Sequence, residues 1–290
     1  MRLILILTAL LAFQSAAASE YEELLIRANT GNAVSQYELA EHIASNYNWA
    51  ESIIWYRKSA EQGHLDAQYG LAKSLLDDNN SASGSNLTEA LQWLTQASGK
   101  NHAAAKVAFA NLYRDGIRIP GNADEAGRLY RSAADLGNVE AQYRVASTFE
   151  KLGKSKYKDS IAWYEKAANS SQPTVNEEYW QEVSRFRLGE IYEAGKMDKK
   201  DLVKAFSWYE LAAQHRNSYA MAKLAAMYEK GLGIKRDRPK ALMWYMIAAS
   251  RGVSKSRKKV ARLSKKFPSA EIQTISMLAS ECRVKGFKNC

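Results

Sequence analysis

The stretch ALMWYMIAASRG, residues 241–252, recurs in related form five more times along the chain. Every copy has Trp or Leu at its fourth position, with Ala or Ser three residues before it and four residues after it. The other copies are SIIWYRKSAEQG (52–63), ALQWLTQASGKN (90–101), AGRLYRSAADLG (126–137), SIAWYEKAANSS (160–171) and AFSWYELAAQHR (205–216). Residues at these spacings share one face of an α-helix. The pattern predicts one helix per copy, whose small residues let a second helix approach while the large side chain fills the remaining gap.

The fourth position is therefore predicted to lie in the core of each copy. Its occupants are Trp55, Trp93, Leu129, Trp163, Trp208 and Trp244. An exposed Trp-Tyr pair could instead stack on sugars or bases, but recurrence at a fixed slot favours packing between repeats. Tyr245, next to Trp244, is expected at the same seam with its hydroxyl reaching a polar edge.

A second motif, with small residues at its first and last positions, follows each copy and predicts another helix. It begins at Ser35, Ala67, Ala105, Ala141, Ser184, Ala220 and Ser256. The steps between these starts are 32, 38, 36, 43, 36 and 36 residues. The longest step contains SQPTVNEEYW (171–180), where Pro173 is expected to interrupt the helix. Trp180, in this insertion, lies outside the repeat pattern.

The turn between the two helices has its own rule. Gly63, Asn101, Gly137 and Gly252 close four copies, and Gly and Asn tolerate the left-handed conformation that ends a helix. Ser171 and Arg216 occupy this position in the other two copies, so those two turns are expected to differ.

Together these slots resemble the Sel-one-like subclass of tetratricopeptide repeats over residues 34–256. The resemblance implies an all-α, right-handed superhelix (solenoid) of about six antiparallel helix pairs. It also implies that the chain's role is to hold other proteins. The missing glycines in two turns and the insertion at Pro173 depart from the family's pattern.

The two ends predict capping segments. Residues 1–18, with Arg2, an apolar run and AAA at 16–18, are typical of a secretory signal peptide cut after Ala18, the alternative being an uncleaved anchor. Residues 19–33 are predicted to form an N-terminal capping helix. Residues 257–290 are predicted to form basic C-terminal capping helices, the second starting at a Ser269 N-cap. In an exported chain, Cys282 and Cys290 favour a disulfide over two free thiols.

The motifs of catalysis are missing from the sequence. It contains no zinc-protease, serine-hydrolase or phosphate-loop pattern in its required context. His64 and His102 share one repeat slot, which favours a solvent-facing turn position over a ligand role. The glycosylation patterns at Asn79, Asn86 and Asn169 are interpreted as loop and helix-cap residues. We predict no catalytic residue, no metal and no cofactor.

Charge is concentrated at the C-terminus. Residues 251–290 hold eleven Lys or Arg and two Glu, which accounts for +9 of the net +10. The fourth position of the second motif also becomes basic along the chain, through Arg144, Arg187, Lys223 and Lys259. Equivalent slots stack in a solenoid, so these four residues are predicted to form a basic row that binds an acidic partner or anionic polymer. The alternative is a solvated, solubilising face.

These observations predict a non-enzymatic scaffold or adaptor in the periplasm of a Gram-negative bacterium, or secreted, that holds a segment of another protein in its groove. The partner is expected to be an exported or membrane-anchored protein, and nucleic acid is not expected. Two alternatives stay open. One is a cell-wall or β-lactam hydrolase with a cleft near Trp180. The other is direct binding of peptidoglycan or an anionic polysaccharide through the basic C-terminal surface.

Overall fold

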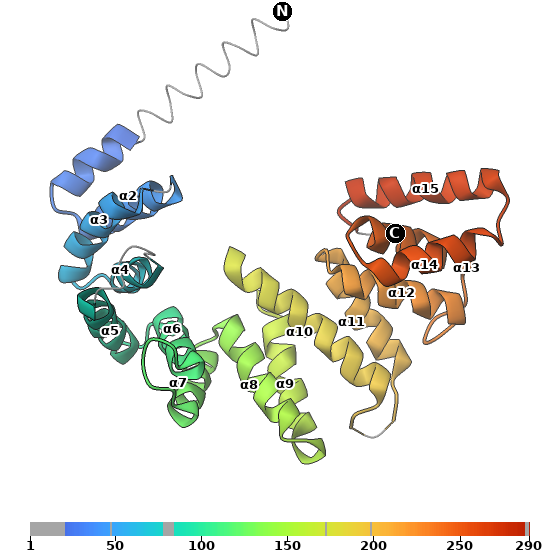
Figure 1. Ribbon diagram of the computed structural model, residues 1–290, viewed down its shortest axis with the longest axis horizontal. Coiled ribbons are helices and arrows are strands. Elements are labelled where there is room, and N and C mark those ends of the chain that lie inside the picture. Colours follow the sequence, from blue (N-terminus) through green and yellow to red (C-terminus); the bar gives the residue numbers. More distant parts are fainter. Residues whose placement is uncertain (1–20, 47, 78–83, 172, 198, 288–289) are drawn as a thin grey trace, which may run out of the picture. The chain divides into compact units, whose positions relative to one another are not determined.

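The computed structural model describes residues 21–46, 48–77, 84–171, 173–197, 199–287 and 290, and these residues fold almost entirely as helices (Figure 1). The predicted signal peptide, residues 1–18, and Asn79 lie outside the described residues. The described chain divides into two compact units, residues 1–136 and 137–290, which are taken separately below. Within each unit, consecutive helices form the antiparallel pairs that the sequence predicts.

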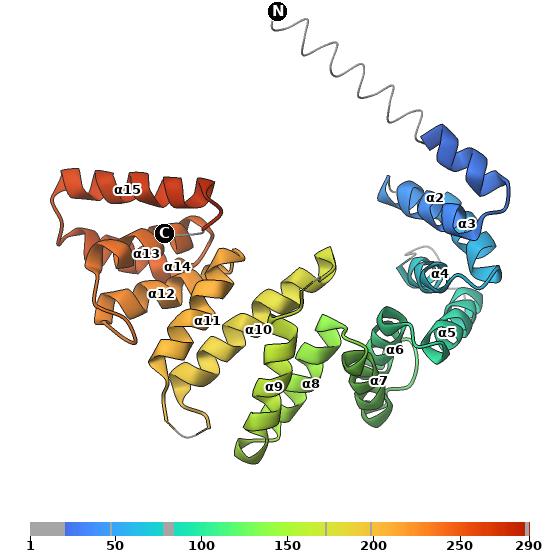
Figure 2. The ribbon, with the colours of Figure 1, turned by 180° about the vertical axis from the view of Figure 1, so that it is seen from behind.

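Unit 1 contains a helix at residues 21–29 followed by three helix pairs (Figures 1 and 2). The pairs are α2 (Ala33–Ser45) with α3 (Trp49–Glu61), α4 (Leu65–Asp77) with α5 (Gly84–Gly99), and α6 (Ala103–Asp115) with α7 (Ala123–Asp135). Each pair also packs on the next, through contacts of α3 with α4 and of α5 with α6. Leu39, Leu71 and Leu94 are completely buried in the resulting core.

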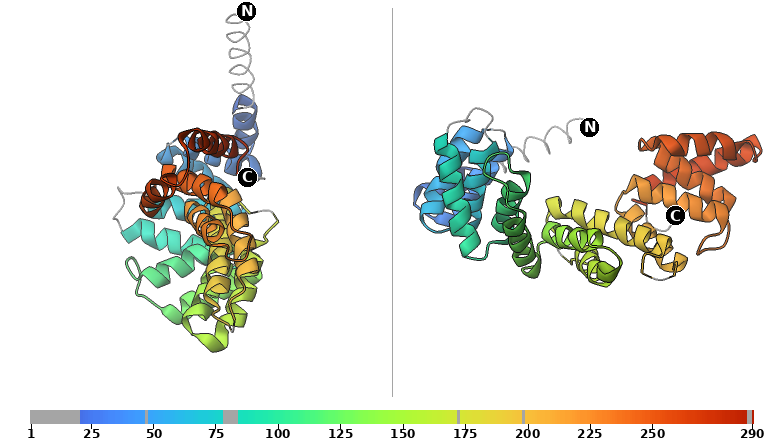
Figure 3. Two further views of the ribbon diagram at one scale, coloured as in Figure 1. Left: turned by 90° about the vertical axis from the view of Figure 1, so that its right-hand side faces the viewer. Right: turned by 60° about the horizontal axis from the view of Figure 1, so that its bottom comes forward.

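Unit 2 continues the pattern with three further pairs and two terminal helices (Figure 3). The pairs are α8 (Val139–Lys151) with α9 (Tyr157–Ala168), α10 (Val175–Ala194) with α11 (Leu202–Gln214), and α12 (Ser218–Lys230) with α13 (Arg238–Ser250). A short 3-10 turn, Lys154–Lys156, precedes α9. Helices α14 (Ser254–Ser264) and α15 (Ser269–Val284) both pack on α13. We call the first helix of each pair helix A and the second helix B.

The small residues of helix B are buried as their spacing predicts. All twelve residues at the −3 and +4 positions are at most 4% exposed. Two of them also bond the facing helix: Ser59 Oγ donates to the carbonyl of Ala33 at 2.6 Å, and Ser160 Oγ to that of Ala146 at 2.8 Å. Small side chains therefore set the close approach of the two helices, and hydroxyl groups at this seam find backbone partners.

The residue after the Trp slot is buried more uniformly than the Trp slot itself. Trp55, Trp163 and Trp244 are buried, whereas Trp93, Leu129 and Trp208 are half-buried. The following position, in contrast, is at most 8% exposed in every copy. Its occupants are Tyr56, Leu94, Tyr130, Tyr164, Tyr209 and Tyr245. The fourth positions, predicted to lie in the core, are thus only half-buried in three of the six copies, because the side chain one residue further on points more directly at helix A.

Neighbouring pairs are also joined by side chains at the second position of the helix A motif. Gln36 Nε2 donates to the carbonyl of Ala28 at 3.1 Å, and Gln68 Nε2 to that of Ala60 at 3.2 Å. These carbonyls belong to the last turn of a preceding helix, where each also accepts the backbone N–H of a turn glycine, Gly31 or Gly63. The bond from Gln36 shows that residues 21–29 stand where a helix B would stand, whereas Ala33, the last residue of the capping segment predicted at 19–33, already belongs to α2.

The turn rule holds for one residue that was expected to break it. Gly63, Asn101, Gly137 and Gly252 have φ values between 63° and 94°. Arg216 also has a positive φ, 72°, so this turn has the shape of the others and the prediction that it differs is wrong. The hydrogen bonds that close the turn outweigh the energetic cost of a left-handed backbone conformation at a residue that has a Cβ. At Ser171 the chain does differ, and it leads through Pro173 into α10.

The insertion lengthens a helix rather than adding a loop. Helix α10 has 20 residues, while the other helices A of the six pairs have 13. Thr174 starts α10 with a capping box, in which Glu177 accepts a hydrogen bond from the backbone of Thr174 at 3.0 Å. The extra turns carry Tyr179 and Trp180, so the insertion presents two aromatic residues on a rigid element.

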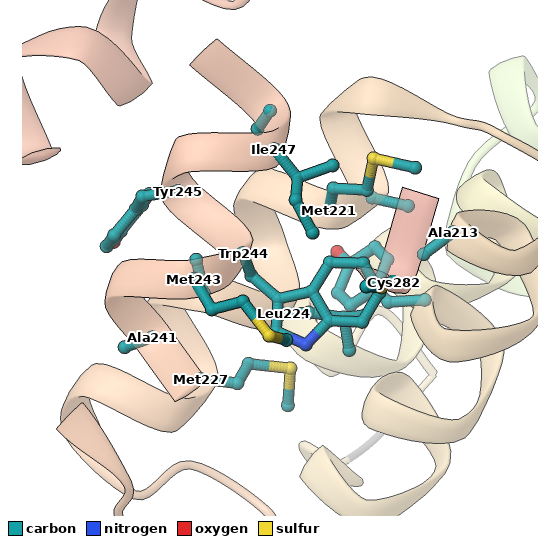
Figure 4. Close-up of a cluster of buried hydrophobic side chains, with 14 of the residues drawn as sticks. Ala213, Met221, Leu224, Met227, Ala241, Met243, Trp244, Tyr245, Ile247 and Cys282 are labelled. Carbon is teal, nitrogen blue, oxygen red and sulfur yellow. The ribbon is translucent and has the colours of Figure 1, made fainter. Parts of the chain in front are cut away.

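The C-terminal cap closes the last hydrophobic cluster. Trp244 lies among Met221, Leu224 and Met227 of α12, with Cys282 of α15 nearby (Figure 4). Cys282 and Cys290 form a disulfide, and Phe287 between them is only 5% exposed. Helix α15 begins one residue earlier than predicted, because Pro268 is its N-cap and Ser269 its first helical residue. None of the described helices is both long enough and apolar enough to span a bilayer.

Candidate interaction surface

A buried carboxylate connects three successive helices in unit 2. Glu150 of α8 is 8% exposed and accepts a 2.9 Å hydrogen bond from the Tyr164 hydroxyl of α9. Arg187 and Lys196, on and just after α10, reach the same carboxylate at 3.0 and 2.7 Å. Burial alone would raise the pKa of Glu150, but the bonds from Lys196, Arg187 and Tyr164 outweigh it and hold the pKa below its ordinary value. The carboxylate therefore stays ionised near neutral pH and is shared by two repeats.

The same arrangement recurs twice further along unit 2. Glu193 of α10 accepts from Tyr209 and from Lys223 Nζ of α12, both at 2.6 Å. Glu229 of α12 accepts from Tyr245 at 3.0 Å and is paired with Lys259 and Arg262 of α14. In each case a helix A carboxylate receives the tyrosine of its own helix B and a cation from the next helix A. We call these three sets the Tyr-Glu-cation links.

These links change the interpretation of the basic row. Arg187, Lys223 and Lys259 each lie against a carboxylate of the preceding helix A, and Arg187 also pairs with Glu190 at 2.6 Å. Arg144, the first residue of the row, pairs with Glu140 at 3.0 Å. The predicted open basic row is thus internally neutralised. The physical reason is that the glutamates nine residues after each motif start face the cations of the following repeat.

An aromatic cluster surrounds Trp180 on the extra turns of α10. The rings of Tyr143 and Tyr179 have their centroids 4.9 and 5.0 Å from that of Trp180. The guanidinium of Arg144 lies 4.5 Å from the Trp180 ring centroid, within cation-π distance. Tyr179 itself is 58% exposed. Rings held by packing but open on one side are suited to receiving a partner's side chains.

The aromatic cluster has a counterpart on the next repeat. Phe186 of α10 lies 6.4 Å from Tyr219 of α12, centroid to centroid, and 5.7 Å from the buried Tyr209. Tyr219 is 65% exposed. Between the two clusters, Asn217 donates a 2.7 Å hydrogen bond to Glu182, which ties the start of α12 to α10. We call Tyr143, Tyr179, Trp180, Phe186 and Tyr219 the aromatic surface.

Unit 1 uses the two predicted turn histidines as helix caps. Nδ1 of His64 and of His102 accepts the backbone N–H of Ala67 and Ala105, at 3.2 and 3.1 Å. His64 stacks on Tyr37, with centroids 4.9 Å apart, and Nε2 of His102 lies 3.0 Å from Asp66. Both histidines are half-buried rather than solvent-facing, but their task is local and structural.

The described residues contain no group of three or more His, Cys, Asp or Glu arranged to hold a metal ion. The tyrosines of the Tyr-Glu-cation links are not poised for proton transfer either. Burial and the adjacent carboxylate raise the pKa of Tyr209 and of Tyr245, so both hydroxyls stay protonated as donors. The geometry of these polar groups serves repeat-to-repeat attachment.

The Sel1 repeat family model matches residues 50–64, 65–102, 101–138, 139–171, 183–217 and 218–253. This chain belongs to the Sel1 repeat family. The resemblance predicted from the repeat slots is thereby confirmed, as is the all-α solenoid fold class. The matched Sel1 repeats leave out residues 172–182, which include the first turns of α10 with Tyr179 and Trp180. Tyr179 and Trp180 therefore lie outside the matched repeats, whereas Tyr219, the most exposed residue of the aromatic surface, lies inside one.

Two solved structures share the fold. The chain superposes with a TM-score of 0.74 on c5321, a protective antigen of uropathogenic Escherichia coli, at 24% identity over 91% of this chain and 56% of the antigen. It superposes with a TM-score of 0.67 on a Sel1 repeat protein from Oxalobacter formigenes, at 23% identity over 85% of this chain and 99% of that protein. At these identities the likeness concerns the fold of the Sel1 repeats.

Two of the curated relatives come from fungi. Chitin synthase regulator SKT5 of Saccharomyces cerevisiae is 26% identical over 74% of this chain and 36% of its own length. Chitin synthase regulatory factor 2 of Schizosaccharomyces pombe is 33% identical over 63% of this chain and 36% of its own length. The Sel1 repeat chain thus spans about a third of these relatives.

Reasoning from sequence missed the aromatic surface, although part of its signal was visible. The third position of the helix A motif is aromatic at Tyr37, Tyr69, Tyr143 and Phe186. Trp180 was recognised as lying outside the repeats, but the sequence alone did not place it beside Tyr143. Only the added turns of α10 bring the two residues together.

Proposed function

We propose that the protein is a non-enzymatic periplasmic adaptor that binds a segment of a partner protein on the aromatic surface of unit 2. The observation that carries this proposal is the pair of exposed tyrosines, Tyr179 and Tyr219, anchored on rings that are held in place by α8, α10 and α12. Tyr, Trp and Arg are the residue types that dominate protein-protein binding energy. A rigid aromatic surface also costs little conformational entropy on binding.

Membership in a repeat family supports the same role. Stacked repeats offer an extended surface on which one peptide contacts side chains of several repeats. The fungal relatives are named as regulators of chitin synthase, which suggests action through another protein. The periplasmic location is proposed from residues 1–18, whose pattern is typical of an export signal.

A site-specific photo-crosslinker at position 179 or 219, in the producing cells, tests the binding surface. We expect a discrete crosslinked partner at both positions and none at position 211, a helix B position that is also exposed. Tyr219→Ser should then weaken binding of that purified partner at least tenfold, which corresponds to about 1.4 kcal/mol or more. Equal crosslinking at position 211, or unchanged affinity of the variant, would contradict the proposal.

Cell fractionation tests the location. The protein should be released by osmotic shock, with a mature N-terminus at Ser19 by mass spectrometry. A variant without residues 1–18 serves as the control and should stay in the cytoplasm. Recovery of the unmodified chain from the cytoplasm, with Met1 still present, would overturn the periplasmic part of the proposal.

A further inference from the structure

Five of the seven cations at residues 255–266 differ from those of the basic row in having no carboxylate partner among the described residues. Lys259 and Arg262 are paired with Glu229, whereas Lys255, Arg257, Lys258, Lys265 and Lys266 are exposed and form no ion pair with the described residues. The repeat-to-repeat links therefore pair only two of the seven positive charges at residues 255–266. The remaining five are available to a ligand.

These free cations are ordered by the helix. Residues three, seven and ten positions apart share one face of an α-helix, and this is the spacing of the free Lys255, Lys258 and Lys265 with the paired Arg262 between them. Lys265 is the C-cap of α14, and Lys266 follows it. The buried face of α14 holds Ser256 and Leu263, which are about 1% exposed. From Lys255 to Lys266 the row is about 16 Å long, at ~1.5 Å per residue. We call Lys255, Lys258, Lys265 and Lys266 the α14 lysine stripe.

We infer that the α14 lysine stripe is a docking surface for an acidic segment of a partner protein. Charge complementarity requires an anion, because the stripe lacks any acidic side chain of its own. An extended peptide of about five or six residues covers 16 Å at ~3.3 Å per residue. A short run of Asp and Glu would therefore match the length of the stripe.

Anionic polysaccharides and anionic membranes fit this surface less well. The exposed face of α14 has no aromatic side chain on which a sugar ring could stack, and no large apolar side chain that could enter a membrane. Lysine ammonium groups act as mobile point charges without the fixed fork of arginine. Mobile lysines therefore favour a flexible acidic peptide over a ligand that has to be bound in one fixed geometry.

The inference is independent of the aromatic surface. It concerns α14 at the C-terminal end of unit 2, and it stands whether or not Tyr179 and Tyr219 bind a partner. If both proposals hold, one partner could use an acidic segment on α14 and a second segment on α8, α10 and α12. Separate variants of the two surfaces distinguish the proposals.

The test uses the full mature chain and a fluorescein-labelled deca-glutamate peptide, with binding measured by fluorescence anisotropy at low and moderate salt. The stripe variant is Lys255→Gln, Lys258→Gln, Lys265→Gln and Lys266→Gln. The control variant changes Lys73, Lys100, Lys151 and Lys230 to Gln, four exposed lysines scattered over both units. Both variants lose four positive charges, and Gln maintains helix propensity, so melting temperatures should stay close to that of the original protein.

We expect the stripe variant to weaken peptide binding roughly tenfold and the control variant less than twofold, with affinity falling as salt screens the charges. Tyr219→Ser should leave this binding unchanged. Equal losses in both lysine variants would show an effect of net charge and overturn the inference. So would the absence of binding at millimolar peptide, or tighter binding of polygalacturonate or of phosphatidylglycerol vesicles than of the peptide.

Discussion

Glu193 of α10 and Lys223 of α12 lie 2.6 Å apart, Oε2 to Nζ, and belong to two successive repeats. The Tyr209 hydroxyl, within the repeat of Glu193, donates to the same carboxylate oxygen. One carboxylate thus fixes both the helix pair to which it belongs and the repeat that follows. Because the arrangement recurs at Glu150 and Glu229, polar links and hydrophobic stacking run together along unit 2.

Removing the charge of Glu150 should destabilise unit 2. Glu150→Gln leaves Arg187 and Lys196 without their shared anion. Breaking a fully buried ion pair costs several kcal/mol of folding stability. Since both cations are about one-third exposed, we expect the free energy of unfolding to fall by about 2 kcal/mol. Urea denaturation followed by circular dichroism measures the loss. Glu210→Gln, at an exposed position of α11, is the matched control and should change stability by less than about 0.5 kcal/mol.

Acid should weaken the same links. The pKa values of Glu150, Glu193 and Glu229 lie below the ordinary value because their hydrogen bonds and cations outweigh burial. A carboxylate with a lowered folded pKa contributes stability above its unfolded pKa and loses it as the pH falls through the folded pKa. Stability should therefore decline below about pH 4.3, the ordinary pKa of Glu.

One group opposes this trend. Burial raises the pKa of Glu182, so its protonation on acidification favours the folded state. Urea midpoints between pH 7 and pH 3 test the balance. Changing Glu150, Glu193 and Glu229 together to Gln should flatten the acid slope, and an unchanged slope in that variant would mean that other carboxylates cause it.

The left-handed turn at Arg216 predicts a stabilising change. Its φ of 72° is costly for a residue with a Cβ, so Arg216→Gly should raise the free energy of unfolding by about 0.5–1 kcal/mol. Gly252→Ala, at the equivalent turn with φ 94°, should have the opposite effect and of similar size. Melting temperatures that fall in both variants would show that Arg216 makes a contact worth more than the backbone strain.

The uneven burial of the Trp slot predicts unequal losses. Trp244 is 4% exposed, and Trp244→Ala should cost about 3–5 kcal/mol and reduce amide-exchange protection in α12, α13 and α15. Trp208 is half-buried, so Trp208→Ala should cost at least about 1 kcal/mol less. Equal losses at the two positions would mean that burial of the ring does not decide the energy.

Some features were predictable because they depend on residues close in sequence. The helices, their small-residue faces and four of the turns follow from spacings of three, four and seven residues, which a helix converts directly into a common face. The disulfide between Cys282 and Cys290 spans eight residues and was expected because the chain was predicted to be exported and has two cysteines. Arg216 was mispredicted because its own preference was considered without the closing bonds of the turn.

Other features depend on which residues meet across repeats. The row of Arg187, Lys223 and Lys259 is visible in the sequence, but its neutralisation needs glutamates 30 to 37 residues away, brought into contact by stacking. The same holds for Trp180, which reaches Tyr143 only because α10 is extended by its insertion. The sequence by itself determined a helical repeat protein with a basic C-terminus. Tertiary structure decided which cations are already paired. A cation next to a carboxylate within a few ångströms is neutralised, whereas a cation without one remains able to attract an anionic ligand.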